Sequence, residues 1–248
     1  MRSYVNAALV FLSVLVLPLR AMANPVSFET ADGFEISGDI EFPNSGLALR
    51  PAVIFIHQGG SDKSEWIETD LYKWVVDKGM VAFSYDVRGH GKSEGEFDYE
   101  LFDDPERAPK DLEAALQFLA TQDNIDMTRI GIVGSSIGAN LAMVGVSHED
   151  FDIRTAVAMS GKTSAWLNLA GVTEPSVQPQ SVYLIAGEQE QGGKRAAWAK
   201  EMFDMSSDPK TLEIIAGSSA HGTKLFKDAP GLQTRICKWL TSHLTEKP

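Results

Sequence analysis

Cysteine is nearly absent from this sequence: the 248 residues include only Cys237, so no disulfide can form within one chain. This cysteine falls on the apolar side of a predicted C-terminal helix, which favours a buried structural thiol. After the first residues, no apolar run approaches the roughly 20 residues that a membrane span requires. Zinc-binding spacings such as H-E-x-x-H, the nucleotide-binding G-x-G-x-x-G pattern and a P-loop are missing too. We therefore expect no metal and no cofactor.

Positive charge is scarce as well. The chain carries 22 Lys and Arg against 34 Asp and Glu, which gives a formal net charge of −12. Such an acidic surface argues against nucleic acid and anionic lipid as partners. No low-complexity tract or repeat interrupts the sequence, and its composition is that of a globular protein. The sequence leaves the oligomeric state open.

Residues 1–23 have the pattern of a cleaved secretory signal peptide. Arg2 supplies the positive charge, residues 7–19 form the apolar region, and Ala21-Met22-Ala23 fits an A-x-A cleavage site. We expect a mature domain over residues 24–248 that is free of the membrane after cleavage. It would be periplasmic or extracellular, and the sequence does not separate these two destinations.

Strands and helices alternate along most of the remaining sequence. Residues 26–42 alternate polar and apolar side chains around Asp32-Gly33, which predicts an antiparallel hairpin. Later strands are predicted at 51–57, 80–85, 130–133, 153–159, 181–186 and 212–216, with helical patterns between most of them. This order predicts an α/β fold, with a mostly parallel sheet and helices on both faces. The short connection over 160–180 leaves no room for a large lid.

The stretch from Arg129 to Gly145, RIGIVGSSIGANLAMVG, combines a buried strand, a tight turn and a helix. The turn has the pattern G-x-S-x-G with Ser136 at its centre, and in this context it strains the serine and exposes its Oγ above the sheet. The N–H of Ile137 would then point to where negative charge develops on a reacting carbonyl. The stretch predicts a nucleophilic serine, and a glycine-rich turn without chemistry is the alternative.

Other strand ends carry residues that could complete such a site, because ligands bind at the carboxyl ends of parallel strands. His221 lies in a loop of small residues with no apolar periodicity to bury it, which favours a catalytic base. Glu190 follows the strand at 181–186 and could orient that histidine, with Glu188 as the reserve. The order Ser136, Glu190, His221 is the one expected for a nucleophile-elbow enzyme.

At this point the sequence resembles the α/β-hydrolase superfamily, especially its compact, lidless members related to dienelactone hydrolases, small esterases and serine aminopeptidases. Residues 86–93, DVRGHGKS, are similar to its D-x-R-G-x-G-x-S turn, and residues 57–60, HQGG, to its H-G-x-G oxyanion loop. Residues 217–222 resemble its histidine loop. The resemblance implies a second oxyanion donor at Gly59 or Gln58. The family usually has Asp where Glu190 stands.

These observations predict a secreted serine hydrolase that cleaves a carboxylic ester of a small-molecule acyl substrate through an acyl-enzyme. A serine exopeptidase or amidase is the alternative, and so is a non-catalytic binding protein on a hydrolase scaffold. The sequence does not settle acyl chain length or the choice between ester and amide.

The sequence also suggests pocket-lining and structural roles for residues around this site. Aromatic residues that could line the substrate pocket, or pack against the sheet instead, are Trp66, Phe97, Tyr99, Phe102 and Trp166. The family resemblance implies structural roles for His57 and His90, and we expect Arg88 to brace its turn through backbone carbonyls.

Overall fold

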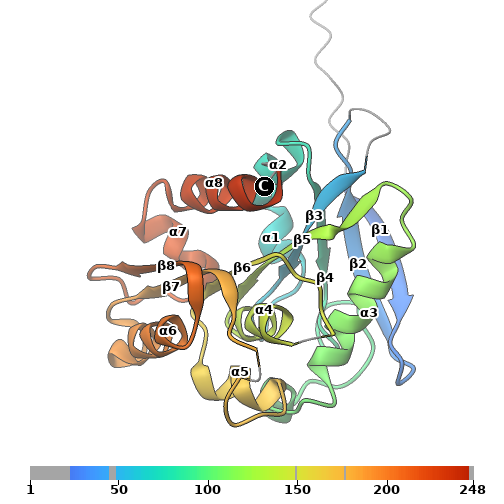
Figure 1. The fold of residues 1–248 in the computed structure, drawn as a ribbon. Helices are drawn as coiled ribbons and strands as arrows, with labels where there is room; N and C mark the ends of the chain where they lie inside the picture. The colour runs from blue at the N-terminus through green and yellow to red at the C-terminus, as the bar shows by residue number, and fades with distance from the viewer. Residues whose placement is uncertain (1–22, 45–48, 149, 176, 246–248) are drawn as a thin grey trace, which may run out of the picture.

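A computed structural model describes residues 23–44, 49–148, 150–175 and 177–245 (Figure 1). Residues 1–22 of the predicted signal peptide lie outside the described residues, so the signal peptide and its cleavage remain predictions. Within the described ranges, no helix has both the length and the apolar character needed to cross a bilayer.

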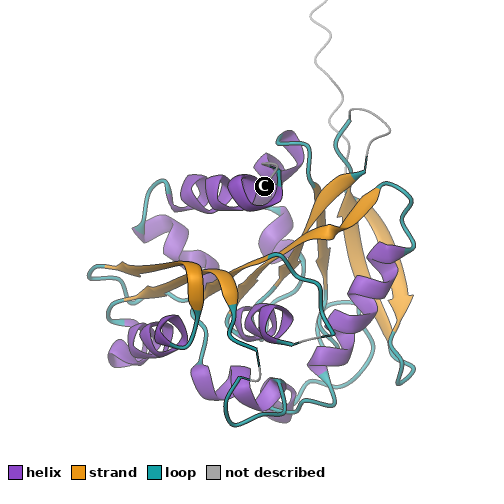
Figure 2. Cartoon of the chain, in the orientation of Figure 1, coloured by secondary structure: helices purple, strands orange, loops and turns teal. Residues whose placement is uncertain are grey.

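The centre of the fold is an eight-stranded sheet in the order β1-β2-β4-β3-β5-β6-β7-β8 (Figure 2). Strands β1 and β2 form an antiparallel hairpin, β2 pairs antiparallel with β4, and the remaining pairs are parallel. The predicted mostly parallel sheet and N-terminal hairpin are confirmed. The strands are β1 (Asn24–Glu29), β2 (Glu35–Glu41), β3 (Arg50–Ile56), β4 (Val81–Tyr85), β5 (Ile125–Ser135), β6 (Thr155–Met159), β7 (Gln180–Gly187) and β8 (Ser207–Ile215).

Helices cover both faces of the sheet, as the sequence predicts (Figure 1). The first face carries α1 (Ser64–Ile67), α2 (Asp70–Asp77), α7 (Leu225–Asp228) and α8 (Leu232–Leu244). The second carries α3 (Ala108–Ala120), α4 (Ile137–Ser147), α5 (Thr163–Leu169) and α6 (Lys194–Asp204). Short 3-10 turns are η1 (Tyr99–Phe102), η2 (Glu190–Gly193) and η3 (Gly222–Lys224).

Each face has its own apolar core. Buried Val53, Phe55 and Val133 point to the α2 and α8 side, whereas Ile54, Ile56 and Ile132 point to the α3 and α4 side. This alternation along one strand, with both faces apolar, is why the central strands read as continuous hydrophobic runs. Among the described residues between β6 and β7, α5 is the only helix, and these residues form no large lid.

Two predicted elements have different boundaries in the structure. The helical segment predicted between the strands at 51–57 and 80–85 is divided into α1 and α2, because Thr69 adopts an extended conformation and its Oγ1 caps α2 by accepting from the Tyr72 N–H at 3.2 Å. The last strand begins at Ser207, earlier than the predicted 212, because its first residues pair with β7 although they are polar.

Candidate active site

Ser136 stands at the turn between β5 and α4, in a backbone conformation that few non-glycine residues adopt. Its φ is +55° and its ψ is −110°. The flanking glycines leave no room for side chains: a Cβ on Gly134 would lie 2.0 Å from the Gly138 carbonyl oxygen, and one on Gly138 would lie 2.1 Å from the Ile56 oxygen. The Ser136 N–H is held by the Met159 carbonyl at 2.9 Å. The sequence pattern and this packing together explain the strained serine.

Glu190 and His221 are brought together at the carboxyl ends of β7 and β8. The Nδ1 atom of His221 lies 2.5 Å from Glu190 Oε1. The histidine side chain is 32% exposed, whereas the glutamate side chain is 2% exposed. Glu188, the reserve residue, instead accepts the Gly217 N–H at 2.7 Å. The carboxylate thus fixes one ring nitrogen and leaves Nε2 as the nitrogen that can take a proton.

A serine that the sequence analysis did not single out holds this pair in place. Ser160, at the end of β6, donates its hydroxyl to Glu190 Oε2 at 2.8 Å and accepts the Gly222 N–H at 2.9 Å. The Gly187 N–H also points to Oε2, at 3.3 Å. Ser160 has a φ of +58°, which makes it a second strained position at the site. The hydroxyl connects the acid directly to the histidine loop.

The histidine loop lies against the nucleophile turn. A Cβ built on Gly222, the residue after His221, would approach Ser135 Oγ to 3.0 Å and Ser135 Cβ to 3.2 Å. The residue that follows the histidine therefore packs on the residue that precedes Ser136. The histidine loop, the nucleophile turn and the turn that carries Glu190 therefore meet at one end of the sheet.

Arg195 adds a second charge beside the acid. Its Nη1 donates to the Ser160 carbonyl at 2.7 Å, and its Nε lies 3.7 Å from Glu190 Oε1. The side chain is 11% exposed, and desolvation lowers the pKa of Arg195. The Glu190 carboxylate thus lies between the Arg195 guanidinium and the His221 imidazole.

The oxyanion loop follows β3, and its first peptide N–H is already engaged. The Gln58 N–H donates to Glu65 Oε2 at 2.9 Å. Of the two residues that the resemblance implied as donors, Gly59 therefore remains the candidate. The Ile137 N–H, in the first turn of α4, has no partner within its own helix and is the other proposed donor.

Glu65 accepts hydrogen bonds from three of the loops that form the site. Besides the Gln58 N–H, its carboxylate accepts the Ser135 hydroxyl at 2.9 Å and the Thr223 hydroxyl at 3.0 Å, both through Oε1. Gln58 belongs to the oxyanion loop, Ser135 to the nucleophile turn and Thr223 to the histidine loop. One side chain on the short helix α1 therefore sets the spacing of these loops.

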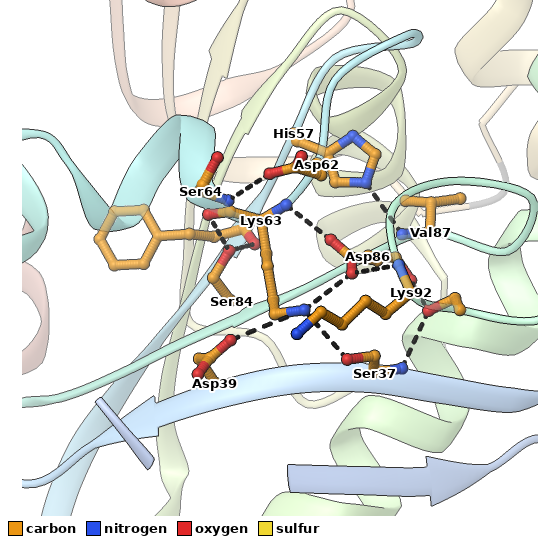
Figure 3. Close-up of polar contacts among 12 residues, drawn as sticks. Ser37, Asp39, His57, Asp62, Lys63, Ser64, Ser84, Asp86, Val87 and Lys92 are labelled. Carbon is orange, nitrogen blue, oxygen red and sulfur yellow. Dashed lines mark hydrogen bonds and ion pairs between the residues drawn. The ribbon is translucent and has the colours of Figure 1, made fainter. Parts of the chain in front are cut away.

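A buried ionic network anchors the far side of the oxyanion loop (Figure 3). Asp86 Oδ1 accepts the Lys63 N–H at 2.7 Å, and Oδ2 accepts Lys63 Nζ at 2.8 Å and the Lys92 N–H at 2.9 Å. Lys63 Nζ also donates to Ser37 Oγ at 3.0 Å. A Cβ on Gly91 would lie 2.4 Å from the Asp86 carboxyl carbon, so the turn needs glycine there. The Asp and Gly of the 86–93 motif thus serve to fasten the loop.

His57 takes part in the same anchoring (Figure 3). Its Nε2 accepts the Val87 N–H at 2.9 Å, so Nδ1 carries the proton and donates to the Gln58 carbonyl at 2.8 Å. Burial lowers the pKa of His57 to about 4, which keeps the ring neutral. These contacts agree with the structural role implied for this histidine.

With this geometry established, similarity to known proteins identifies the chain. The model of the family described as "Serine aminopeptidase, S33" matches residues 49–215, which is more than half of the 248 residues. The chain belongs to this family. Together with the fold, the match places it in the α/β-hydrolase superfamily, as the sequence motifs indicated.

The curated relatives of this family member are longer proteins. YcjY of Escherichia coli is 32% identical over 122 residues, which cover 48% of this chain and 39% of YcjY. YfhR of Escherichia coli is 22% identical over 201 residues, which cover 80% of this chain and 63% of YfhR. The chain therefore spans less than two thirds of the length of either relative.

Solved structures share the fold at low sequence identity. An esterase of Pyrococcus furiosus has a TM-score of 0.68 at 20% identity, covering 90% of this chain and 94% of the esterase. An acetyl xylan esterase from a Paenibacillus species has a TM-score of 0.71 at 15% identity, covering 93% and 87%. At these identities the likeness concerns the fold alone.

Some residues of this α/β-hydrolase have other roles than the sequence predicted. Arg88 does not brace its turn through carbonyls: it donates to Asp111 at 2.7 Å and to Asp32 at 2.7 and 3.0 Å, because a buried guanidinium requires a charged partner. Trp66 and Trp166 are fully buried in the two cores and cannot line a pocket. Of the aromatic residues considered, Phe97, Tyr99 and Phe102 remain.

Three residues of the site escaped the sequence analysis: Glu65, Ser160 and Arg195. Ser160 had a usable signal, since it stands at the carboxyl end of a predicted strand, where site residues gather. Glu65 and Arg195 lie in helical segments with no motif around them, and only the folded chain shows which loops they contact.

Proposed function

We propose that this family member is a secreted or periplasmic serine hydrolase that cleaves carboxylic esters with Ser136, Glu190 and His221. The hydrogen bond between His221 Nδ1 and Glu190 Oε1, next to a strained serine turn, is the observation that supports the proposal most strongly. A buried carboxylate that fixes the tautomer of an exposed histidine is the arrangement that activates a serine hydroxyl.

In the first half-reaction, Ser136 Oγ bonds to the carbonyl carbon of the ester while its proton passes to His221 Nε2. The N–H groups of Ile137 and Gly59 stabilise the negative oxygen of the tetrahedral intermediate. The intermediate collapses, the bond to the alcohol oxygen breaks, and His221 returns the proton to the departing alcohol. Glu190 stabilises the transient imidazolium without being protonated itself.

In the second half-reaction, a water molecule attacks the acyl-enzyme carbonyl and gives one proton to His221. The second tetrahedral intermediate breaks its bond to Ser136 Oγ, which regains that proton, and a carboxylic acid leaves. No cofactor or metal takes part in this proposed sequence. A water-accessible histidine, 32% exposed, suits a step in which water must reach the site.

Labelling with a fluorophosphonate, together with turnover of p-nitrophenyl esters, tests the proposal. Ser136→Ala should lose the label and leave only the residual rate, about 10³–10⁴-fold over water, that oxyanion stabilisation and binding supply. Ser135→Ala is the matched control, since it removes one hydroxyl from the same turn and should keep the label. A fully active Ser136→Ala variant would refute the assignment.

The same experiment separates the two alternatives. If aminoacyl p-nitroanilides are cleaved faster than p-nitrophenyl esters, the chain is a serine exopeptidase or amidase, a reading that the family's description favours. If the wild-type protein neither takes the label nor cleaves any substrate, it is a non-catalytic binding protein on this scaffold.

The proposed location has its own test. The protein expressed with its natural N-terminus in a Gram-negative host should be found outside the cytoplasm, starting near Asn24. Recovery of a cytoplasmic protein that still begins at Met1 would contradict the signal peptide. The charge-reversing variant Arg2→Glu should slow export, because the positive residue precedes the apolar region.

A further inference from the structure

Three aromatic side chains form an exposed cluster beside the proposed oxyanion loop. Phe97 and Tyr99 contact each other with ring centroids 5.6 Å apart, and Phe102 lies 5.7 Å from Phe97 and 6.1 Å from Tyr99. All three pairs meet edge to face. Phe97 is 45% exposed and Tyr99 is 79% exposed. Large apolar rings gathered in solvent are unusual for a surface loop and mark a place where another group binds.

The cluster adjoins the proposed reaction centre directly. A Cβ atom built on Gly59 would lie 2.5 Å from Phe102 Cζ, so the ring packs against the backbone that presents the proposed oxyanion donor. A substrate carbonyl held at the Gly59 N–H therefore has the cluster as its near neighbour. A group attached to that carbonyl can therefore extend along these rings.

The loop that carries the rings is held in a defined shape. Both carboxylate oxygens of Asp98 accept Arg107 Nη1 at 2.7 Å, and Asp98 Oδ1 also caps η1 by accepting the Leu101 N–H at 3.1 Å. Phe97 stands edge-on against the ring of His90, with centroids 5.0 Å apart. Aromatic surface that is fixed before binding costs little conformational entropy when a ligand arrives.

The charges of the same loop restrict what can bind there. Between residues 94 and 104, every charged side chain of the loop and of the 3-10 turn η1 is acidic, and Asp98 among them is paired with Arg107. An anionic group would be repelled by these carboxylates, whereas an uncharged ring would not. The other acidic residues are Glu94, Glu96, Glu100, Asp103 and Asp104.

We propose that Phe97, Tyr99 and Phe102 form a subsite for an uncharged aryl group of the ester substrate. The inference rests on the proposed function, whose substrate class it names. Aryl groups gain more than aliphatic groups of equal size on such a surface, because edge-to-face contacts between rings add to the burial of apolar area. The aryl group belongs to the acyl part or to the alcohol part of the ester, and the substrates below distinguish these.

Two matched pairs of esters test the subsite with the full-length protein. Methyl phenylacetate and methyl cyclohexylacetate differ only in the ring of the acyl part, and benzyl acetate and cyclohexylmethyl acetate only in that of the alcohol part. Wild-type kcat/KM should favour the aryl member of one pair. Phe97→Leu and Tyr99→Leu keep apolar area but lose the ring face, so each should reduce that preference about twofold to tenfold.

Leu49→Ala is the matched control. Leu49 is 58% exposed and precedes β3, at the opposite end of that strand from Gly59. This variant should leave both ratios unchanged and keep kcat/KM for all four esters within about twofold of wild type.

Two outcomes would overturn the subsite alone. The first is the absence of any aryl preference in a protein that hydrolyses the cyclohexyl esters, which leaves the proposed function intact. The second is an aryl preference that survives both Leu substitutions. If the Leu variants in this second case also adsorb less to phosphatidylcholine vesicles than the wild-type protein does, the cluster is a lipid-docking patch. Hydrolysis of no ester at all, without fluorophosphonate labelling, would overturn the proposed function and the subsite with it.

Discussion

Exchanging the buried carboxylate for an amide, Glu190→Gln, probes the proposed catalytic chain with almost no change of shape. The Oε2 side of Glu190 receives hydrogen atoms from the Gly187 N–H and from the Ser160 hydroxyl. The Ser160 hydroxyl, whose oxygen also accepts the Gly222 N–H, donates its hydrogen to the carboxylate, because a carboxylate can only accept. The Gly187 N–H can only donate, so it determines which side of residue 190 has to be an acceptor.

An amide placed here keeps its oxygen on that side and turns its NH₂ toward His221 Nδ1. The imidazole must then accept at Nδ1 and carry its proton on Nε2, so it cannot take the proton of Ser136. Reversing the amide costs about 1–3 kcal/mol, since the buried Gly187 N–H then faces an NH₂ group. Losing the charge opposite the imidazolium costs a further ~1.5–3 kcal/mol. At 1.36 kcal/mol per factor of ten, kcat should fall about 10²- to 10⁴-fold.

Steady-state kinetics on a p-nitrophenyl ester measures the effect, and KM should change little, because the substitution does not alter substrate contacts. Glu188→Gln is the control: its exposed carboxylate accepts only the neighbouring Gly217 N–H and should be nearly silent. Circular dichroism should report an unchanged fold for both variants. A Glu190→Gln enzyme within tenfold of wild type, or an equal loss in Glu188→Gln, would refute the tautomer argument.

Further predictions follow from the contacts around the site. Glu65→Gln offers one oxygen and one NH₂ group where two carboxylate oxygens accept hydrogen bonds, so the donors on one side lose their acceptor. We expect kcat to fall about tenfold or more at unchanged KM, and a loss confined to thermal stability would contradict the positioning role of Glu65. Arg88→Met strands Asp111, which is fully buried, and should lower the free energy of unfolding in urea by about 3–5 kcal/mol. Hydrogen bonds from Arg88 lower the pKa of Asp32, so the ionised carboxylate stabilises the folded state. In urea unfolding, the wild-type protein should therefore be more stable than Asp32→Asn above about pH 4, and this difference in the free energy of unfolding should shrink as the pH falls further. A difference that does not change with pH would refute this.

The local sequence was sufficient to predict the structure wherever a few consecutive residues determine the backbone conformation. The glycines around Ser136 predicted a strained turn, and in the structure the carbonyls of Gly138 and Ile56 exclude a Cβ at Gly134 and Gly138 respectively. The alternation of apolar strands and amphipathic helices predicted the sheet and both layers, since such strands can only be buried on both sides. The Asp32-Gly33 pair likewise predicted the hairpin that the structure contains, with Gly33 at a φ of +86°.

Contacts between distant segments were not predictable in the same way. Glu65 bonds to Thr223 across 158 positions and to Ser135 across 70, and nothing in the residues around it signals either partner. Trp66 and Trp166 illustrate a choice that the sequence leaves open, since large aromatic side chains serve a pocket or a core equally well. Their indole N–H groups donate to Ile56 O and Ser147 Oγ, partners that are visible only in the folded chain.

The carboxylate of Glu65 also bears on how this enzyme scaffold can change. Because one side chain coordinates the oxyanion loop, the nucleophile turn and the histidine loop, an exchange in any of these loops alters the anchor of the other two. Substitutions that each raise activity in one of these loops should give less than additive gains when combined, as expected for residues that share one hydrogen-bonding partner. The loop with Phe97 and Tyr99 has its own fastening through Asp98 and touches the oxyanion loop only through Phe102, so it is less constrained than the catalytic loops. New substrate preferences are therefore more accessible to the scaffold by varying that loop than by remodelling the catalytic ones.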